Sequence, residues 1–480
     1  MSRSLNHICT LVLFFILSTL LISFRTIEDV HATCSSITDL PTRPIQPSDG
    51  SFPIAPPDIT ISDCRTVAPG TYTAGYINIV DGGILQFDET SDSQTNFYAK
   101  SILVEQGGTL KAGDFTTNVP FGKNGGKLTI GLWGAGPADI ASDPTPNYAP
   151  IACKSNGGNC YPADRVAKYC DASKSATDPC QAPAGSDNAY FQGYQALNYD
   201  GNGIFGFKAL AISYGGTLEL YGNKGVDKTY QVTPPTKSVA ACDIPSSNQN
   251  DIQSWADGSG TSWGRLNGDV IAHSSTPLQL DRDLGLEPGD KLVLSPTDWH
   301  PNHHELLEVK SYDAVSLQAT LASAPAYDHQ GTAYQIDDSA LTSVTTNPNK
   351  SIDVRGAVGL LSRSITIRSM GSTYDQTTGL PVDFPLAKDC GCPDGVCSTN
   401  ADCFFGGHVI ARQGFAKYQV QGVEFYQLGQ GSRMGHYPVH FHLAKQTSYT
   451  NAFVTDSAIW DSQTRFVVLH GTHNMRPQHN

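Results

Sequence analysis

The segment at residues 77–85, which reads INIVDGGIL, decides the fold of this chain because its pattern occurs three times. The other copies are ILVEQGGTL at residues 102–110 and LAISYGGTL at residues 210–218. Each copy predicts a short strand, a tight turn over two glycines and a second short strand, since glycine adopts the positive φ that such turns need. Repeats of this kind bury their apolar faces by stacking, so the pattern predicts a β-solenoid.

The spacing of the copies indicates where extra chain is inserted. The first two begin 25 residues apart, about one coil, whereas the third begins 108 residues after the second. That interval contains a polar stretch at about residues 136–202 with four cysteines. We interpret it as a disulfide-linked insertion in the solenoid, because solenoids commonly carry insertions on one face.

A second segment, GSRMGHYPVHFHL at residues 431–443, concentrates histidines in a strand pattern. The alternation puts apolar side chains on one face and histidines on the other: Val439, Phe441 and Leu443 against His440 and His442. If the apolar face is core, both imidazoles point to solvent. His470 follows His442 by 28 residues, near one coil, so stacking would bring these two about 4.8 Å apart.

These histidines are candidates for chemistry. Neutral imidazole is a common metal ligand and titrates near neutral pH, so His440, His442 and His470 are candidate catalytic residues and candidate ligands of a divalent metal ion. The alternative is a stacked polar ladder that orients loops through hydrogen bonds.

Two aspartates lie between the histidine segments. Asp456 and Asp461 are candidate catalytic carboxylates, because glycoside hydrolysis uses a pair of carboxyl groups. The alternative is that each caps its own turn. The candidate substrate-binding residues nearby are Arg433, His436, Arg465 and His473. Either arginine can hold a carboxylate or a sulfate through bidentate bonds, and the equal alternative is that the two only screen an acidic surface.

Two other groups stand out. The stretch WHPNHHE at residues 299–305 has metal ligands and an aromatic ring suited to a sugar, although we favour a role in stabilising its loop. Asp353 and Arg355 lie among apolar residues, so we expect a buried ion pair between coils.

The net charge and the N-terminal sequence limit which binding partners and which cellular compartment fit this protein. The net charge is −14, which argues against nucleic acid because polyanion binding needs a basic surface. Residues 1–32 read as a secretory signal, with an apolar run and a Val-His-Ala site before Thr33. We expect a secreted or cell-surface protein that contacts a membrane only if the signal stays uncleaved.

Cysteine usage agrees with export. Eleven cysteines follow the signal, and an oxidising compartment pairs most of them. The Gly- and Pro-containing segment at residues 390–403 holds four, for which disulfides are favoured over a zinc knuckle.

Longer motifs make a family resemblance specific. VAPGTYTAGYINIVDGGILQF, SILVEQGGTLKAG, PFGKNGGKLTIGLWG and KALAISYGGTLELYG resemble the G8 domain. SIDVRGAVGLLSRSITI, FGGHVIARQGF, GVEFYQLGQGSRMGHYPVHFHL and VVLHGTHN look like the region after that domain in the cell-migration-inducing, hyaluronan-depolymerising proteins and their transmembrane relatives. The resemblance spans most of residues 57–475.

This resemblance implies an all-β fold in which a G8 β-solenoid-like domain precedes a right-handed parallel β-helix, truncated at its C-terminus. The expected organisation is a signal peptide at residues 1–32, a proline-rich linker at 33–56, a G8 domain at 57–222, an intermediate β region at 223–345 and an incomplete β-helix at 346–480.

For function, the resemblance implies an exported protein that binds or cleaves extracellular polysaccharide, with hyaluronan the first candidate and a hyaluronidase-like hydrolase the implied enzyme. The alternative is a non-catalytic adhesive solenoid. The interval at residues 225–265 favours it, being too short for the further GG module of the family's animal members.

Overall fold

The computed structural model describes a defined part of the chain, and several predicted features lie outside it. The expected signal peptide, most of the proline-rich linker, the insertion at 136–202, and three of the cysteines in the segment 390–403 are among these. No described helix is long and apolar enough to span a membrane. The described residues are 34–38, 40, 56–88, 92, 94–134, 207–213, 215–226, 262–335, 351–375, 377–385, 403, 405–412, 414–431, 435–478 and 480.

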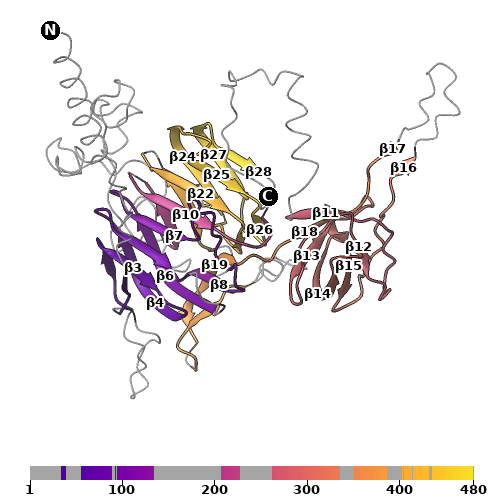
Figure 1. Cartoon of the computed structure of the whole chain (residues 1–480), viewed down its shortest axis with the longest axis horizontal. Coiled ribbons are helices and arrows are strands. Elements are labelled where there is room, and N and C mark those ends of the chain that lie inside the picture. The colour runs from indigo at the N-terminus through magenta and orange to yellow at the C-terminus, as the bar shows by residue number, and fades with distance from the viewer. Residues whose placement is uncertain are drawn as a thin grey trace, which may run out of the picture. The chain divides into compact units, whose positions relative to one another are not determined.

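The chain is all-β, and its first large sheet forms one face of a solenoid. The two-residue strand β1 (Ser35–Ser36) comes first in the chain. The strands of the face run parallel (Figure 1), in the spatial order β3 (Cys64–Val67), β5 (Ile84–Phe87), β7 (Thr109–Ala112), β10 (Thr217–Tyr221), β22 (Lys417–Gln421), β25 (Ala452–Thr455) and β28 (Arg476–Gln478). Successive neighbours come from successive coils, as the Gly-Gly repeat predicts.

The second large sheet supplies the other two faces, because β6 (Gln94–Val104) bends between them. Its first half pairs with β8 and its last three residues pair with β9. One arm is β8 (Lys127–Leu132), β19 (Ile365–Tyr374), β23 (Val423–Tyr426) and β26 (Ala458–Trp460); the other is β9 (Ala209–Ile212), β21 (His408–Arg412), β24 (Val439–Gln446) and β27 (Val467–His473). Three further strands join this sheet: β4 (Gly70–Ile79) pairs with β6, β2 (Ile59–Ile61) pairs with β4, and β20 (Pro381–Asp383) pairs with β19.

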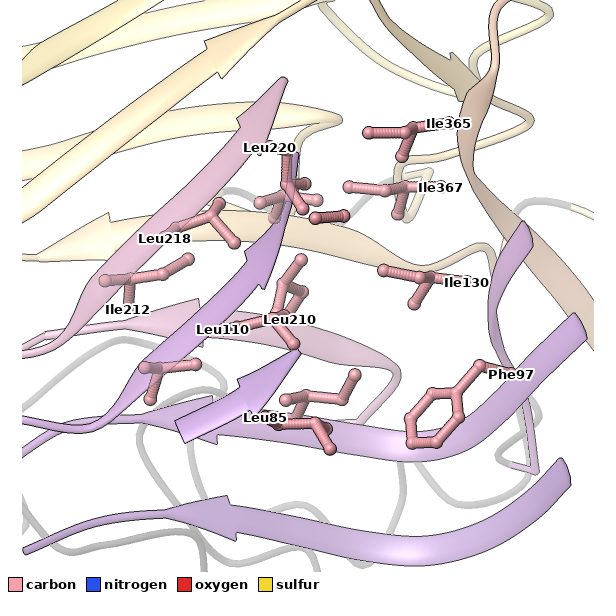
Figure 2. Packing of buried hydrophobic residues seen from close by; sticks show 14 of the residues in the cluster. Leu85, Phe97, Leu110, Ile130, Leu210, Ile212, Leu218, Leu220, Ile365 and Ile367 are labelled. Carbon is pink, nitrogen blue, oxygen red and sulfur yellow. The ribbon is translucent and has the colours of Figure 1, made fainter. Parts of the chain in front are cut away.

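The three Gly-Gly copies stack in register, which confirms the repeat. Leu85 pairs with Leu110, and Leu110 pairs with Leu218. These side chains are buried in one continuous apolar cluster, whose labelled members in Figure 2 pack between strands of separate coils. Burying such a leucine is worth roughly 1.5 to 3 kcal/mol, so stacking gives each coil most of its stability.

The second glycine of each pair is required by the coil below it. A Cβ on Gly83 would lie 2.2 Å from the carbonyl oxygen of Ile61, and one on Gly108 would lie 2.1 Å from that of Ile79. Gly216 repeats the arrangement against Val104, again at 2.1 Å. The first glycine of each pair, by contrast, is required by its backbone conformation, because its φ lies between 76° and 81°, where other residues are strained.

A separate antiparallel module lies between the solenoid strands in sequence. Its spatial order is β11 (Trp263–Arg265), β18 (Ala357–Leu360), β13 (Lys291–Leu294), β14 (Glu305–Asp313), β15 (Gln318–Leu321) and β12 (Leu278–Gln279). The short pair β16 (Tyr334–Gln335) and β17 (Ser351–Ile352) and the single 3-10 turn η4 (Pro301–His303) complete its described elements. It has its own leucine-rich core. Because β18 belongs to it, the module extends beyond the boundary expected at residue 345.

The prediction of a buried ion pair between coils is wrong about where the pair lies. Arg355 Nε does donate to Asp353 Oδ1, at 2.9 Å. The pair lies in the antiparallel module, however, where Ile352 is 50% exposed and Val354 is 39% exposed. The arginine also reaches Asp281 of the same module, at 3.3 Å, so the pair ties a loop to the module and does not join coils.

The described cysteines agree with an oxidising compartment. Cys34, Cys64 and Cys403 are disulfide-bonded, and Cys403 comes from the segment where disulfides were expected. Pro477 lies in β28 and pairs with Val454 of β25.

Candidate functional site

The candidate site lies on the outer face of β21, β24 and β27. Val439 and Phe441 are fully buried in the solenoid core. His440 and His442 alternate with them in β24 and therefore point away from the core, as the sequence pattern predicts.

Strand register brings the polar side chains into line. Arg412 of β21 pairs with His442 of β24, which pairs with His470 of β27. The ring centroids of His442 and His470 are 5.0 Å apart, which confirms the predicted stacking, and those of His440 and His442 are 5.1 Å apart. We call Arg412, His440, His442 and His470 the histidine row.

Exposure changes along the row, and here one expectation is wrong. His440 does not face solvent: it is only 2% exposed. Its Nδ1 lies 2.8 Å from the carbonyl oxygen of Gly435, and its ring packs against Tyr437. The loop before β24 folds back over this end of the strand. His442 is half-buried and His470 is exposed, so the row opens toward β27.

The surroundings keep the inner imidazoles neutral. Burial lowers the pKa of His440 to about 4, against the raising effect of its bond to the Gly435 carbonyl. Burial, followed by the charge of Arg412, lowers the pKa of His442 to about 3. Because a carbonyl only accepts, Nδ1 of His440 carries its proton and Nε2 is left as an acceptor. The row therefore offers neutral hydrogen-bonding groups beside a permanent cation.

Metal binding by the row remains a prediction. In the described ranges, no three histidine, cysteine, aspartate or glutamate side chains are grouped so as to hold a metal ion. Neutral imidazoles are the form that binds metals, but a site also needs its ligands to converge on one point. We therefore derive no chemistry through a metal.

The other candidate binding residues are dispersed. His436 is buried, and its ring meets that of His408 edge to face at 4.4 Å; its role in substrate binding remains a prediction. His473 and Arg465 are exposed at β27 and before it. Arg433 lies outside the described residues.

Leu443 does not follow the expected alternation. Its φ is 52°, and the pairing of β24 with β27 shifts register directly after His442. Leu443 is half-buried, whereas Ala444 is only 5% exposed. The bulge ends the regular strand at His442, which makes that histidine the last one aligned with the row.

The two candidate carboxylates occupy corners of the coil. Asp456 follows β25 and Asp461 follows β26, with φ values of 51° and 50°. Asp456 accepts a hydrogen bond from Gln421 Nε2 at 2.6 Å, and Asp461 accepts one from Gln427 Nε2 at 3.0 Å. Both glutamines belong to the neighbouring coil and not to the turns of the aspartates, so the turn interpretation and the catalytic role both remain predictions.

One acidic residue of interest was missed. Glu424 of β23 alternates with the core residues Val423 and Phe425, and burial raises its pKa above the usual range. Trp460 Nε1 donates to it at 2.8 Å and Thr366 Oγ1 at 2.9 Å. The alternation in GVEFYQ would have placed its side chain on an outer face, although the sequence does not reveal the groups around it.

The histidine-rich loop of the antiparallel module is held by carboxylates, as expected. Asp298 Oδ2 lies 2.6 Å from Nδ1 of His303, and Glu305 Oε1 lies 2.9 Å from Nε2 of His329.

The sequence is similar to two protein-family models and to several known proteins. Residues 48–158 match the G8 domain, and residues 404–480 match the CEMIP beta-helix. The chain is 30% identical over 209 residues to the cell migration-inducing and hyaluronan-binding protein of Mus musculus, an alignment covering 42% of this chain and 13% of that protein. It is 27% identical over 202 residues to the cell surface hyaluronidase CEMIP2 of Homo sapiens, covering 41% and 12%. Human fibrocystin-L is 24% identical over 225 residues, covering 42% and 5%.

The chain thus spans less than a sixth of the length of these relatives. The match to the CEMIP beta-helix includes β21 to β28 and with them the histidine row.

Proposed function

Because the chain is a G8 domain protein that resembles the hyaluronan-depolymerising family, we propose that it binds an extracellular, hyaluronan-like polysaccharide on the outer face of its solenoid. The observation that carries this proposal is the in-register row of Arg412, His442 and His470.

The row suits a polymer with both carboxylates and hydroxyls. The side chain of Arg412 is only 7% exposed, so its guanidinium attracts a carboxylate from beside the open end of the row. The neutral imidazole of His442, which is half-buried, exchanges hydrogen bonds with hydroxyl groups. Stacked strands lie about 4.8 Å apart, so the row presents a side chain about every 4.8 Å along the solenoid axis. Arg465, which precedes β27, and His473, which ends it, are exposed and are the further binding residues of this proposal.

Net charge predicts how binding depends on salt. At −14 the whole chain repels an acidic polymer, while Arg412 attracts it locally. Physiological salt screens charges beyond about 8 Å, which removes the distant repulsion before the close attraction. Affinity for an acidic polymer should therefore hold or rise when salt is raised moderately.

The proposed location rests on the N-terminal sequence and the disulfides. We propose that the segment at residues 1–32 directs export and that the protein acts outside the cell, secreted or at its surface. The disulfide-bonded Cys34, Cys64 and Cys403 support an oxidising compartment.

The test is the affinity of the full chain for hyaluronan oligosaccharides and for neutral glucan oligosaccharides, measured by calorimetry. We expect the wild type to bind the acidic series, and His442→Asn to weaken that binding about fivefold or more through a lost hydrogen bond. His273→Asn, on the antiparallel module, is the matched control. Absence of binding, or equal loss in both variants, contradicts the proposal.

Hydrolysis is the second candidate function, and Glu424 favours it. A glycosidase needs one carboxyl group that stays protonated to donate to the leaving oxygen, and burial raises the pKa of Glu424 in that direction. Asp461 is the candidate second carboxylate, from the sequence-based set that also includes Asp456 and the histidine row.

Polymer size by gel filtration tests hydrolysis. Shortening by the wild type that is lost in Glu424→Gln supports cleavage. An unchanged polymer that nonetheless binds leaves the non-catalytic, adhesive role.

A further inference from the structure

The antiparallel module carries an exposed row of rings. Trp299 is 83% exposed, although burying a large aromatic side chain is strongly favourable. The row runs from Trp299 to His300 at 3.8 Å between ring centroids, from His300 to His303 at 4.6 Å, and from His303 to Tyr327 at 3.9 Å. We call these four residues the aromatic platform.

The Trp299 end of the platform is fixed by Asp298. One carboxylate oxygen accepts the backbone N–H of His300 at 3.0 Å, and the other accepts Nδ1–H of His303 at 2.6 Å. Pro301 begins η4 and further restricts the backbone between these residues. The turn that presents Trp299 is therefore ordered before any ligand arrives.

The Tyr327 end is fixed by Glu305. Its carboxylate accepts the backbone N–H groups of Ala326 at 2.6 Å and Tyr327 at 3.1 Å. The same carboxylate is bonded to His329, which is 2% exposed and bonded on its other side to the Ser295 carbonyl at 2.9 Å. A buried contact thus anchors the surface rings.

Flat rings with polar edges match one class of ligand. Sugar rings present C–H groups on their faces, which pack on an aromatic ring, and hydroxyl groups at their edges, which bond to imidazoles and carboxylates. We propose that the aromatic platform is a second polysaccharide-binding site, on which Trp299 stacks against a pyranose ring while His300 and Asp298 bond to its hydroxyls.

This inference rests on the proposed function for its ligand class, but it uses different chemistry. The histidine row recognises charge and hydroxyls, whereas the platform recognises the face of the ring. The platform should therefore bind neutral and acidic sugars alike, because C–H packing does not depend on a carboxylate.

Calorimetry on the full chain tests the platform, with hyaluronan oligosaccharides and neutral β-glucan oligosaccharides as probes. Trp299→Ala should weaken binding of both series about tenfold, as expected for one lost aromatic stack. Trp299→Phe, which keeps a flat ring, should recover most of the affinity. Trp263→Ala is the matched control, since Trp263 is exposed on the same module but packs against Arg265 and Arg282.

The outcomes separate the two sites. Loss in Trp299→Ala on both series, with Trp263→Ala like the wild type, supports the platform. Wild-type affinity in Trp299→Ala overturns the platform and leaves the histidine row standing. If the wild type binds neither series, both the platform and the proposed function are wrong. Unchanged thermal unfolding of Trp299→Ala verifies that the loss is not a folding defect.

Discussion

The parallel solenoid and the antiparallel module position their side chains in different ways. In the solenoid, neighbours come from other coils: Leu110 packs between Leu85 and Leu218, which is 108 residues away. In the module, β13 and β14 pair as a hairpin, Leu292 beside Leu307. Substitutions in the solenoid should therefore disturb the packing of adjacent coils, whereas those between β13 and β14 should disturb only the local turn.

The largest expected effect tests the stacking of coils. In Gly108→Ala the new Cβ would lie 2.1 Å from the Ile79 carbonyl oxygen, which already accepts the Glu105 N–H at 3.0 Å and so has little freedom to move. We expect a loss of about 4 kcal/mol in the free energy of unfolding, or failure to fold. Denaturant titration measures it.

Gly268→Ala is the control for that substitution. The new Cβ would have its nearest neighbour, Gln279 Cβ, at 3.6 Å, which is ordinary contact. We expect a change within about 0.5 kcal/mol. Equal transition midpoints for the two variants would show that the coils do not pack as described.

The next effect tests the module. Glu305→Gln removes the charge that faces buried His329 at 2.9 Å, and we expect a loss of about 2 kcal/mol. Glu308→Gln breaks only an exposed pair with Lys291, at 3.2 Å, and should cost less than about 0.5 kcal/mol. Comparable losses in the two variants would argue against a buried anchor.

The effect of the histidine row on stability is small at neutral pH and grows as the pH falls. The folded pKa values of His440 and His442 are about 4 and about 3, both below the ordinary 6.5. The unfolded chain therefore binds more protons as pH falls below about 6.5, and each histidine reduces stability by up to about 1.4 kcal/mol per pH unit until its folded pKa is reached.

The double variant His440→Gln/His442→Gln measures that contribution. Its stability should fall less steeply than that of the wild type between pH 6.5 and pH 4. Parallel curves would mean that these imidazoles titrate normally in the folded protein.

The smallest expected effect is on the stability of the module's surface. Trp299→Ala should change the free energy of unfolding by less than about 0.5 kcal/mol, because the side chain is 83% exposed. A clear drop in the unfolding temperature would mean that the ring supports the loop instead of serving a ligand.

Local sequence patterns predicted the solenoid and the row. The Gly-Gly copies repeat the same close approach of a carbonyl, so their stacking could be inferred from spacing. Likewise, the alternation of polar and apolar residues was enough to place His440 and Phe441 on opposite faces of the same strand. Contacts made by distant residues were not predictable: β18 joins the module by pairing Val358 with Gly264 and Leu294, and nothing local to Val358 signals this.

Exposure was the other quantity that alternation could not give. An outward-facing residue in a strand is buried whenever a loop covers it, as the segment containing Gly435 and Tyr437 covers His440. Glu424 is half-buried for a different reason, because Trp460 and Thr366 on the two neighbouring strands bond to its carboxylate. Leu443 departed from the pattern because its positive φ reverses the side-chain direction.

The most direct test of the proposed binding site is the NMR response of the histidine side chains to hyaluronan oligosaccharides. With isotope-labelled histidine in the full chain, we predict that the imidazole signals of His442 and His470 shift as the sugar is added, while that of His273 on the module stays unchanged. Binding of the sugar without any shift of His442 or His470 would contradict the account, because it would place the polymer away from the histidine row.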